Sequence, residues 1–188
     1  MKKLLKSRII DLILVSLLLL LLFVPSIRLP VISNVQKAIL HTGLFNASSE
    51  HTQSDETFDY KLVLYNTAGE QVDMDRKRGK VLFINVWATW CPPCIAEMPE
   101  IAKLYESVGD EVEFLMISVD QDQLKAKKWI RGKAFLVPVY FPRQMNVSLS
   151  YEAIPTTWII DRTGKIVFEQ TGMAQYNTEK FRSFLLSL

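Results

Sequence analysis

The pattern of apolar and polar residues predicts a mixed α/β domain in the second half of the chain. Residues 81–87 form an almost unbroken apolar run, which is typical of a strand buried on both faces. Residues 95–108 then place apolar side chains at helical spacing and stop before Gly109, a residue suited to a helix C-cap. We therefore expect a central strand that leads directly into a helix.

Further strands and helices follow from the same periodicities. Strands are expected at residues 113–119, 137–140, 156–160 and 165–170, and a polar helix at 121–131. The last two strands join at residues 161–164, Asp-Arg-Thr-Gly, a strong turn signal. Asn177 is expected to cap a final helix whose apolar face holds Phe181, Phe184, Leu185 and Leu188. The order β-α-β-α-β-β-α predicts an α/β sandwich with a mixed sheet flanked by helices.

The folded domain is expected to span residues 57–188, because regular apolar patterning starts near Phe58. Leu64 and Val72 flank a turn at residues 66–69, which predicts a small hairpin before the central strand. Residues 25–56 contain prolines and a long polar run, and we expect them to form a linker with a short helix near 31–40.

The first 24 residues have the pattern of a membrane-targeting segment. A basic leader, residues 1–8, precedes an apolar run at residues 9–24 that is broken only by Asp11 and Ser16. Sixteen helical residues span about 24 Å, less than a hydrocarbon core of about 30 Å, so length alone permits either a signal peptide or an anchor. No small-residue cleavage site follows, so we favour an uncleaved transmembrane anchor with the leader in the cytoplasm.

The charge balance excludes a nucleic-acid-binding surface. The leader holds four of the 22 basic residues, and Asp11 is one of the 20 acidic residues, which leaves 18 basic and 19 acidic side chains in the rest of the chain. No nucleic-acid partner is therefore predicted.

The candidate chemistry lies where the central strand meets its helix. The chain has two cysteines, Cys91 and Cys94, at the spacing of a redox-active CxxC motif. Cys91 should lie at the helix start, where free N–H groups stabilise a thiolate, and attack a substrate disulfide; Cys94 would resolve the mixed disulfide. A zinc half-site is the alternative, but zinc needs four ligands and both histidines, His41 and His51, lie in the linker. We predict no metal and no cofactor.

The two residues between the cysteines point to a reducing couple. Pro92 and Pro93 lack N–H groups, so a Cys91 thiolate keeps mainly the donors from Cys94 onward. The less stabilised thiolate should make the couple more reducing than that of an oxidase-type motif. The alternative is that the prolines only stiffen the first turn of the helix, where proline is favoured.

Several motifs resemble the membrane-anchored TlpA/ResA/CcmG branch of the thioredoxin superfamily. They are Asn85-Val86-Trp87-Ala88-Thr89-Trp90-Cys91-Pro92-Pro93-Cys94, Glu97, Pro99 and Ile154-Pro155-Thr156. The resemblance covers residues 57–188 and implies a thioredoxin-like three-layer sandwich. It also implies that Pro155 is in cis, that the Ile154 backbone pairs with substrate, and that Pro99 kinks the active-site helix. The long segment between Cys94 and Pro155 resembles the insertion typical of this branch.

The proton acceptor is expected to differ from that of thioredoxin, which has a buried Asp at the position of Asn85. Asn85 cannot titrate and is interpreted as a hydrogen-bonded core group. Glu97, three residues after Cys94, lies on the same helix face and is the substitute candidate; an ordinary solvated glutamate is the alternative. Trp90 is expected at the exposed rim beside Cys91 and to contact substrate, and Trp87 in the core.

The resemblance implies a membrane-tethered thiol-disulfide oxidoreductase that reduces protein disulfides, for example in cytochrome c or copper-site maturation. Its electrons would come from a membrane partner of the CcdA/DsbD type, and the domain would face the periplasm or cell exterior from the inner membrane. Two alternatives stay open. One is a dithiol oxidase; the other is a Cu(I) chaperone using both thiolates, although no histidine lies in the domain.

Overall fold

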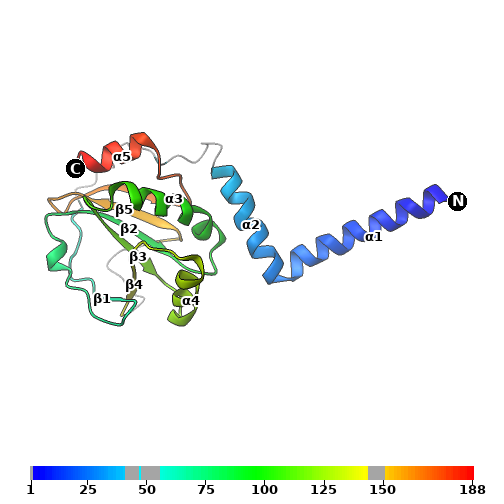
Figure 1. The fold of residues 1–188 in the computed structure, drawn as a ribbon, viewed down its shortest axis with the longest axis horizontal. Coiled ribbons are helices and arrows are strands. Elements are labelled where there is room, and N and C mark those ends of the chain that lie inside the picture. Colours follow the sequence, from blue (N-terminus) through cyan, green and yellow to red (C-terminus); the bar gives the residue numbers. More distant parts are fainter. Residues whose placement is uncertain (1, 41–46, 48–55, 144–150) are drawn as a thin grey trace.

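The computed structural model describes residues 2–40, 47, 56–143 and 151–188. Most of the predicted linker after residue 40, with His41 and His51, and part of the loop before residue 156 lie outside the described residues. Figure 1 shows a sheet-containing domain at one end of the molecule and two helices that lead away from it to the N-terminus.

Six strands in the described residues form one mixed sheet in the order β1-β4-β3-β2-β5-β6. The strands are β1 (Leu64–Asn66), β2 (Val81–Trp87), β3 (Val112–Ser118), β4 (Val139–Pro142), β5 (Thr156–Ile160) and β6 (Ile166–Thr171). β2 pairs with β3 in parallel, and β3 with β4 in parallel, whereas β5 runs antiparallel to both β2 and β6. The predicted mixed sheet is confirmed, and β2 lies near its centre.

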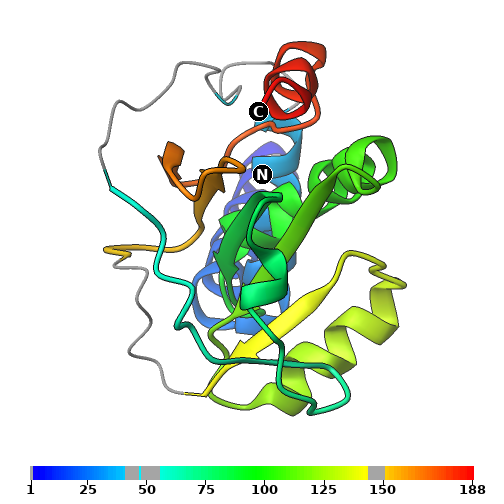
Figure 2. The same cartoon turned by 90° about the vertical axis from the view of Figure 1, so that its left-hand side faces the viewer.

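Helices cover both faces of this sheet. α3 (Pro92–Val108) and α5 (Glu179–Leu186) lie on one face, and α4 (Gln123–Lys133) lies on the other (Figures 1 and 2). All seven side chains of β2 are buried, as expected for a strand covered on both sides. Because β2 runs directly into α3, the segment between them lies at the end of the central strand and at the edge of the core.

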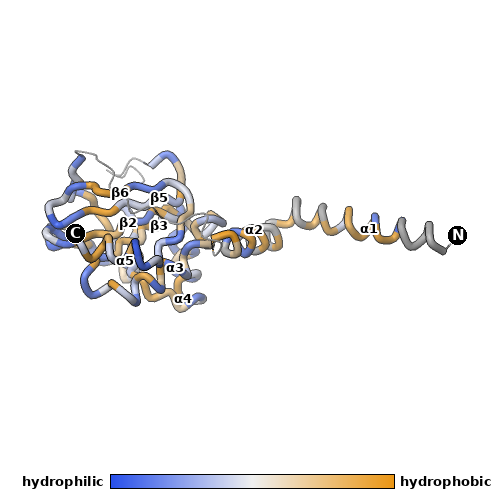
Figure 3. The backbone as a smooth tube through the Cα atoms, turned by 90° about the horizontal axis from the view of Figure 1, so that it is seen from above, coloured by the Kyte–Doolittle hydropathy of each residue, from blue (hydrophilic) through white to orange (hydrophobic). Residues whose placement is uncertain are grey.

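The N-terminal part of the chain forms two helices, α1 (Lys2–Phe23) and α2 (Pro25–Leu40). α2 packs against α3, Ser33 and Leu40 of α2 are buried, and α1 continues away from the domain (Figure 3). In the described part of the chain, no helix is both long and apolar enough to cross a membrane. The transmembrane helix expected at residues 9–24 is therefore not found in that part of the chain.

The structure corrects one local prediction and confirms another. The N-cap of α5 is Thr178, whose hydroxyl accepts from Phe181 N at 3.2 Å, whereas Asn177 accepts instead from the Arg182 guanidinium. The small hairpin around residues 66–69 forms as expected: Val72 N donates to the Leu64 carbonyl at 2.8 Å, and Tyr65 bridges Gln71 in antiparallel fashion. β1 pairs on its other side with β4, which joins this hairpin to the sheet.

Candidate active site

Cys91 occupies the N-cap of α3, directly above the end of the central strand. It forms a disulfide with Cys94, and its sulfur accepts a hydrogen bond from Cys94 N at 3.3 Å. Cys91 is 4% exposed and Cys94 is fully buried. The Cys91 side chain therefore lies nearer the surface than that of Cys94, as expected if Cys91 attacks a substrate disulfide and Cys94 resolves the mixed disulfide.

Pro92 and Pro93 fill the first two positions of α3. Neither has an N–H, so the first backbone donor that reaches the Cys91 sulfur is that of Cys94. The donor arrangement inferred from the sequence is thus present. A thiolate at Cys91 receives less stabilisation than at a helix start with all its N–H groups.

The loop before β5 forms the opposite wall of the site. The peptide bond between Ile154 and Pro155 is cis, as the resemblance implied, and the Ile154 carbonyl oxygen lies 3.7 Å from the Cys91 sulfur. A polypeptide whose disulfide reaches Cys91 must therefore pass beside the backbone of Ile154.

Glu97 is fully buried on the inner face of α3, so the solvated alternative is wrong. Its Oε1 accepts from Asn85 Nδ2 at 2.9 Å, and its Oε2 accepts from Ala174 N at 3.3 Å. Burial raises the pKa of Glu97 to about 8, although both hydrogen bonds act in the opposite direction. A carboxyl with this pKa exchanges protons near neutral pH, and it lies one helical turn from Cys94.

Sequence reasoning missed the residues that complete the surroundings of Glu97. Asn85 Nδ2 also donates to Thr157 Oγ1 at 2.9 Å, and the Tyr176 hydroxyl donates to the same oxygen at 2.8 Å. Burial, followed by the nearby charge of Glu97, raises the pKa of Tyr176 well above its usual value. Thr157 follows the cis-proline loop in β5 and could have been found from that pairing, whereas no sequence signal marks Tyr176.

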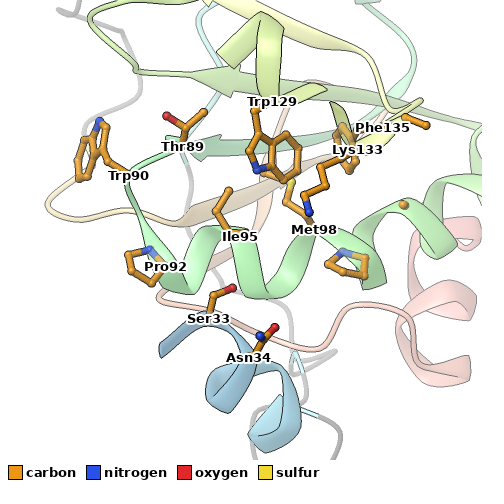
Figure 4. Close-up of a pocket in the computed structure, with 13 residues that line it drawn as sticks. Ser33, Asn34, Thr89, Trp90, Pro92, Ile95, Met98, Trp129, Lys133 and Phe135 are labelled. Carbon is orange, nitrogen blue, oxygen red and sulfur yellow. The ribbon is translucent and has the colours of Figure 1, made fainter. Parts of the chain in front are cut away.

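Trp90 stands at the rim of the site and is 58% exposed. It separates two hollows: one of about 520 Å³ between α2, α3 and α4, and one of about 610 Å³ beside Ile154 and Asp120. Figure 4 shows Ile95 and Met98 of α3 pointing toward Trp129 in the first hollow. Trp90 therefore touches both surfaces along which a polypeptide could approach Cys91.

The loop that carries Trp90 is fastened to β3 by a buried carboxylate. Asp120 accepts from Thr89 N at 3.0 Å and from Thr89 Oγ1 at 2.6 Å, and it also accepts from Ser118 Oγ at 3.0 Å. Both Asp120 and Ser118 are buried. Neither was singled out in the sequence, because Thr89, the residue that Asp120 holds, lies 31 positions away in the chain.

In the described residues, no group of three or more His, Cys, Asp or Glu side chains could hold a metal ion. The two histidines lie outside those residues. The chemistry that the geometry offers is thiol-disulfide exchange at Cys91, with Glu97 as the buried acid-base group.

Comparisons with known proteins agree with this chemistry. The Redoxin family model matches residues 50–182. The thiol-disulfide oxidoreductase ResA of Halalkalibacterium halodurans is 31% identical over 127 residues, which cover 65% of this chain and 72% of the relative. ResA of Geobacillus kaustophilus is 34% identical over 130 residues, covering 68% of this chain and 74% of the relative.

Solved structures show the same fold. A thiol:disulfide interchange protein of the thioredoxin family from Chlorobium tepidum matches with a TM-score of 0.59 and 19% identity, covering 71% of this chain and 99% of that chain. The predicted thioredoxin-like α/β architecture is thereby confirmed. With its Cys91–Cys94 pair at the start of α3, the chain belongs to the Redoxin family as a TlpA/ResA/CcmG-like thioredoxin-fold protein, a thiol-disulfide oxidoreductase.

Proposed function

We propose that this oxidoreductase works as a reductant of protein disulfides outside the cytoplasm, held at a membrane by its N-terminal segment. The observation that carries the reducing direction is the single backbone donor, Cys94 N, at the Cys91 sulfur. A poorly stabilised thiolate favours the disulfide form of the enzyme, and hence electron donation to substrate.

Reduction of a substrate proceeds by two exchanges at sulfur. The Cys91 thiolate attacks one sulfur of the substrate disulfide, and the other substrate sulfur leaves as a thiolate that takes up a proton. The Cys94 thiol then loses its proton to Glu97 and attacks the Cys91 sulfur, which releases the second substrate thiol. Two electrons pass to the substrate, and the enzyme ends with the Cys91–Cys94 disulfide.

The substrate is a disulfide-containing protein, which fits the two hollows that meet at Trp90. Haem-binding cysteines of apocytochromes c and cysteines of copper sites are the substrates that we propose. Since each turnover oxidises the dithiol, an external donor is needed in an oxidising compartment, and we propose a membrane partner of the CcdA/DsbD type.

The basic leader and the apolar sequence of α1 support a place at the membrane. The described apolar side chains of α1, among them Ile13 and Leu17, are exposed, so they are free to enter lipid. Positive residues before an apolar run favour the cytoplasmic side for the leader, which places the catalytic domain outside.

The reduction potential of the Cys91–Cys94 couple tests the direction of electron flow. Equilibration of the full chain with glutathione or dithiothreitol mixtures should give a value closer to about −270 mV, typical of thioredoxin, than to about −120 mV, typical of an oxidase. A value near the oxidase end would instead make the protein a dithiol oxidase. Mixed disulfides trapped with Cys94→Ala would then name the substrate.

A further inference from the structure

The side chain of Asn85 links Glu97 of α3 to Thr157 of β5. Asn85 in β2 is paired in register with Thr157 in β5, and its Nδ2 donates both to Glu97 Oε1 and to Thr157 Oγ1 at 2.9 Å. Asn85 is fully buried, and its Oδ1 has no hydrogen-bond partner in the part of the chain that the structure describes. Buried acceptors without partners are uncommon and call for a physical reason.

The present arrangement suits only the ionised form of Glu97. Asn85 Nδ2 and Ala174 N both donate to the carboxylate oxygens, so neither can accept a hydrogen bond from a protonated carboxyl. A buried O–H without an acceptor carries the full penalty of its lost hydration. The neutral form of Glu97 therefore needs an acceptor that this orientation of the amide withholds.

Turning the amide over supplies that acceptor. With Oδ1 in the place of Nδ2, Asn85 accepts both from the Glu97 O–H and from the Thr157 hydroxyl, while the Tyr176 hydroxyl still donates to Thr157 Oγ1. The oxygen and nitrogen of an amide are nearly equal in size, so the core need not repack. In both orientations, the amide atom without a hydrogen-bond partner lies at the same place: it is Oδ1 before the turn and Nδ2 after it.

We infer that Asn85 is a positioning residue for Glu97, and that its amide turns over whenever Glu97 gains or loses a proton, with Thr157 and Tyr176 as the fixed end of the hydrogen-bond chain. This role rests on the proposed function, in which Glu97 receives the Cys94 proton. The proton stays on Glu97, and the two hydrogen bonds of the Asn85 amide, to Glu97 and to Thr157, both reverse their direction.

The charged and titratable groups around Glu97 leave the positioning of its carboxyl to the Asn85 amide. Near Glu97, Tyr176 from the segment before α5 can titrate, whereas Cys94 on the same helix is held in the disulfide. Glu100, one turn further along α3, is paired with Lys103 at 2.7 Å. Among the described residues, no basic side chain lies within ion-pair distance of the Glu97 carboxylate, so its two protonation states differ mainly in the hydrogen bonds that they require.

Infrared difference spectroscopy of the oxidised full-length protein tests the turn, because a hydrogen-bonded carboxylic acid absorbs at lower frequency than a free one. The acid band that disappears on raising the pH through about 8 is assigned to Glu97 by its absence in Glu97→Gln. We expect the wild-type band at the hydrogen-bonded position and the Asn85→Leu band at the free-acid position. A free-acid band in the wild type, or a band that Asn85→Leu leaves unmoved, would overturn the inference.

Thr157→Val is the matched control, because it removes a partner of Asn85 but none of Glu97. Its acid band should stay at the hydrogen-bonded position; a shift as large as that of Asn85→Leu would also overturn the assignment to Asn85. Asn85→Leu should slow resolution of the mixed disulfide about tenfold near neutral pH. If Asn85→Leu does not fold, the wild-type band alone decides. Unchanged kinetics of mixed-disulfide resolution in Glu97→Gln would refute the proton transfer from Cys94 to Glu97. The infrared test of the Asn85 amide does not depend on that transfer.

Discussion

At the scale of single residues, the site depends on one carboxyl that is kept in the core. Glu97 reaches no solvent, and its ionised form is stabilised by only two hydrogen bonds. Burial raises its pKa from 4.5 to about 8, which places its titration where the Cys94 thiol must release a proton. The property that makes Glu97 useful in exchange therefore also makes folding depend on pH.

Stability measurements on the oxidised protein should reveal this dependence. The unfolded chain loses the Glu97 proton near pH 4.5, whereas the folded protein holds it up to about 8, so stability falls as pH rises across this window. The free energy of unfolding of the wild type, relative to that of Glu97→Gln, should fall by about 1.4 kcal/mol per pH unit in that range. Urea titrations from pH 4 to pH 9 check this; parallel curves for the two proteins would contradict a buried, neutral Glu97.

The two prolines of the motif are not equivalent. A helix N-cap side chain accepts from the second or third helical N–H, and Pro93 occupies the second position of α3. Pro93→Ala therefore adds a donor to the Cys91 thiolate, stabilises the reduced form, and should raise the reduction potential by roughly 10–30 mV.

Pro92→Ala is the control for that change. Its new N–H stands at the first helical position, which does not point at the N-cap side chain, so its potential should stay within a few millivolts of the wild type. Equal shifts in the two variants would show that helix stiffness, rather than donor number, sets the potential of the Cys91–Cys94 couple.

At the scale of secondary-structure elements, β2 and α3 are held in place by their burial, whereas the loop between them is held by hydrogen bonds. β2 is buried along its whole length and α3 packs on it, but Trp90 in the loop is largely exposed. Asp120, after β3, supplies the fastening through Thr89 and Ser118. The position of the exposed indole beside Cys91 is therefore set by the neighbouring strand.

Removing the Asp120 carboxylate should affect substrate binding more than redox chemistry. Asp120→Ala leaves the half-buried Thr89 donors and the buried Ser118 donor without their acceptor and should cost about 1–3 kcal/mol of stability. We expect a several-fold higher KM for a protein disulfide with an unchanged reduction potential. Thr178→Ala, which removes the N-cap of α5 and lines neither hollow, is the comparison and should lower stability by about 1 kcal/mol without raising KM.

The elements with strong periodicity could be predicted from the sequence, and the contacts that complete the site could not. β2, β5 and α3 follow from local patterns of apolar residues. The burial of Glu97 could not, because Ala174 N, which helps to enclose it, comes from a segment 77 positions away. Tyr176 reaches Thr157 from an irregular segment, and no periodicity reports on such a segment. Likewise, Thr178 rather than Asn177 caps α5, since both residue types suit that position.

At the scale of the whole molecule, the segment that we propose to bind the membrane lies apart from the site of the chemistry. α2 lies against α3, whereas α1 continues away from the domain (Figure 1). The active site lies at the end of β2 and draws none of its reacting groups from α1. Attachment and thiol exchange should therefore be separable by deletion.

Cell fractionation and thiol labelling check the proposed location. The full chain should sediment with membranes, and its reduced Cys91 should react in intact cells with a maleimide that does not cross membranes. Deletion of residues 1–24 should leave the protein unlabelled inside the cell while the purified protein keeps its reduction potential. Recovery of the full chain in the soluble fraction would contradict the tether.

The near-complete burial of the Cys91 sulfur has a consequence for the enzyme in an oxidising environment. Only 4% of Cys91 is exposed, and the Ile154 carbonyl stands beside its sulfur. The rate of disulfide exchange depends on access as well as on potential, so small oxidants in the bulk solution should react slowly with the dithiol. If the protein is the reductant that we propose, its reducing equivalents should be insulated kinetically: they should persist far from redox equilibrium with their surroundings until a protein surface of matching shape opens a route to the sulfur.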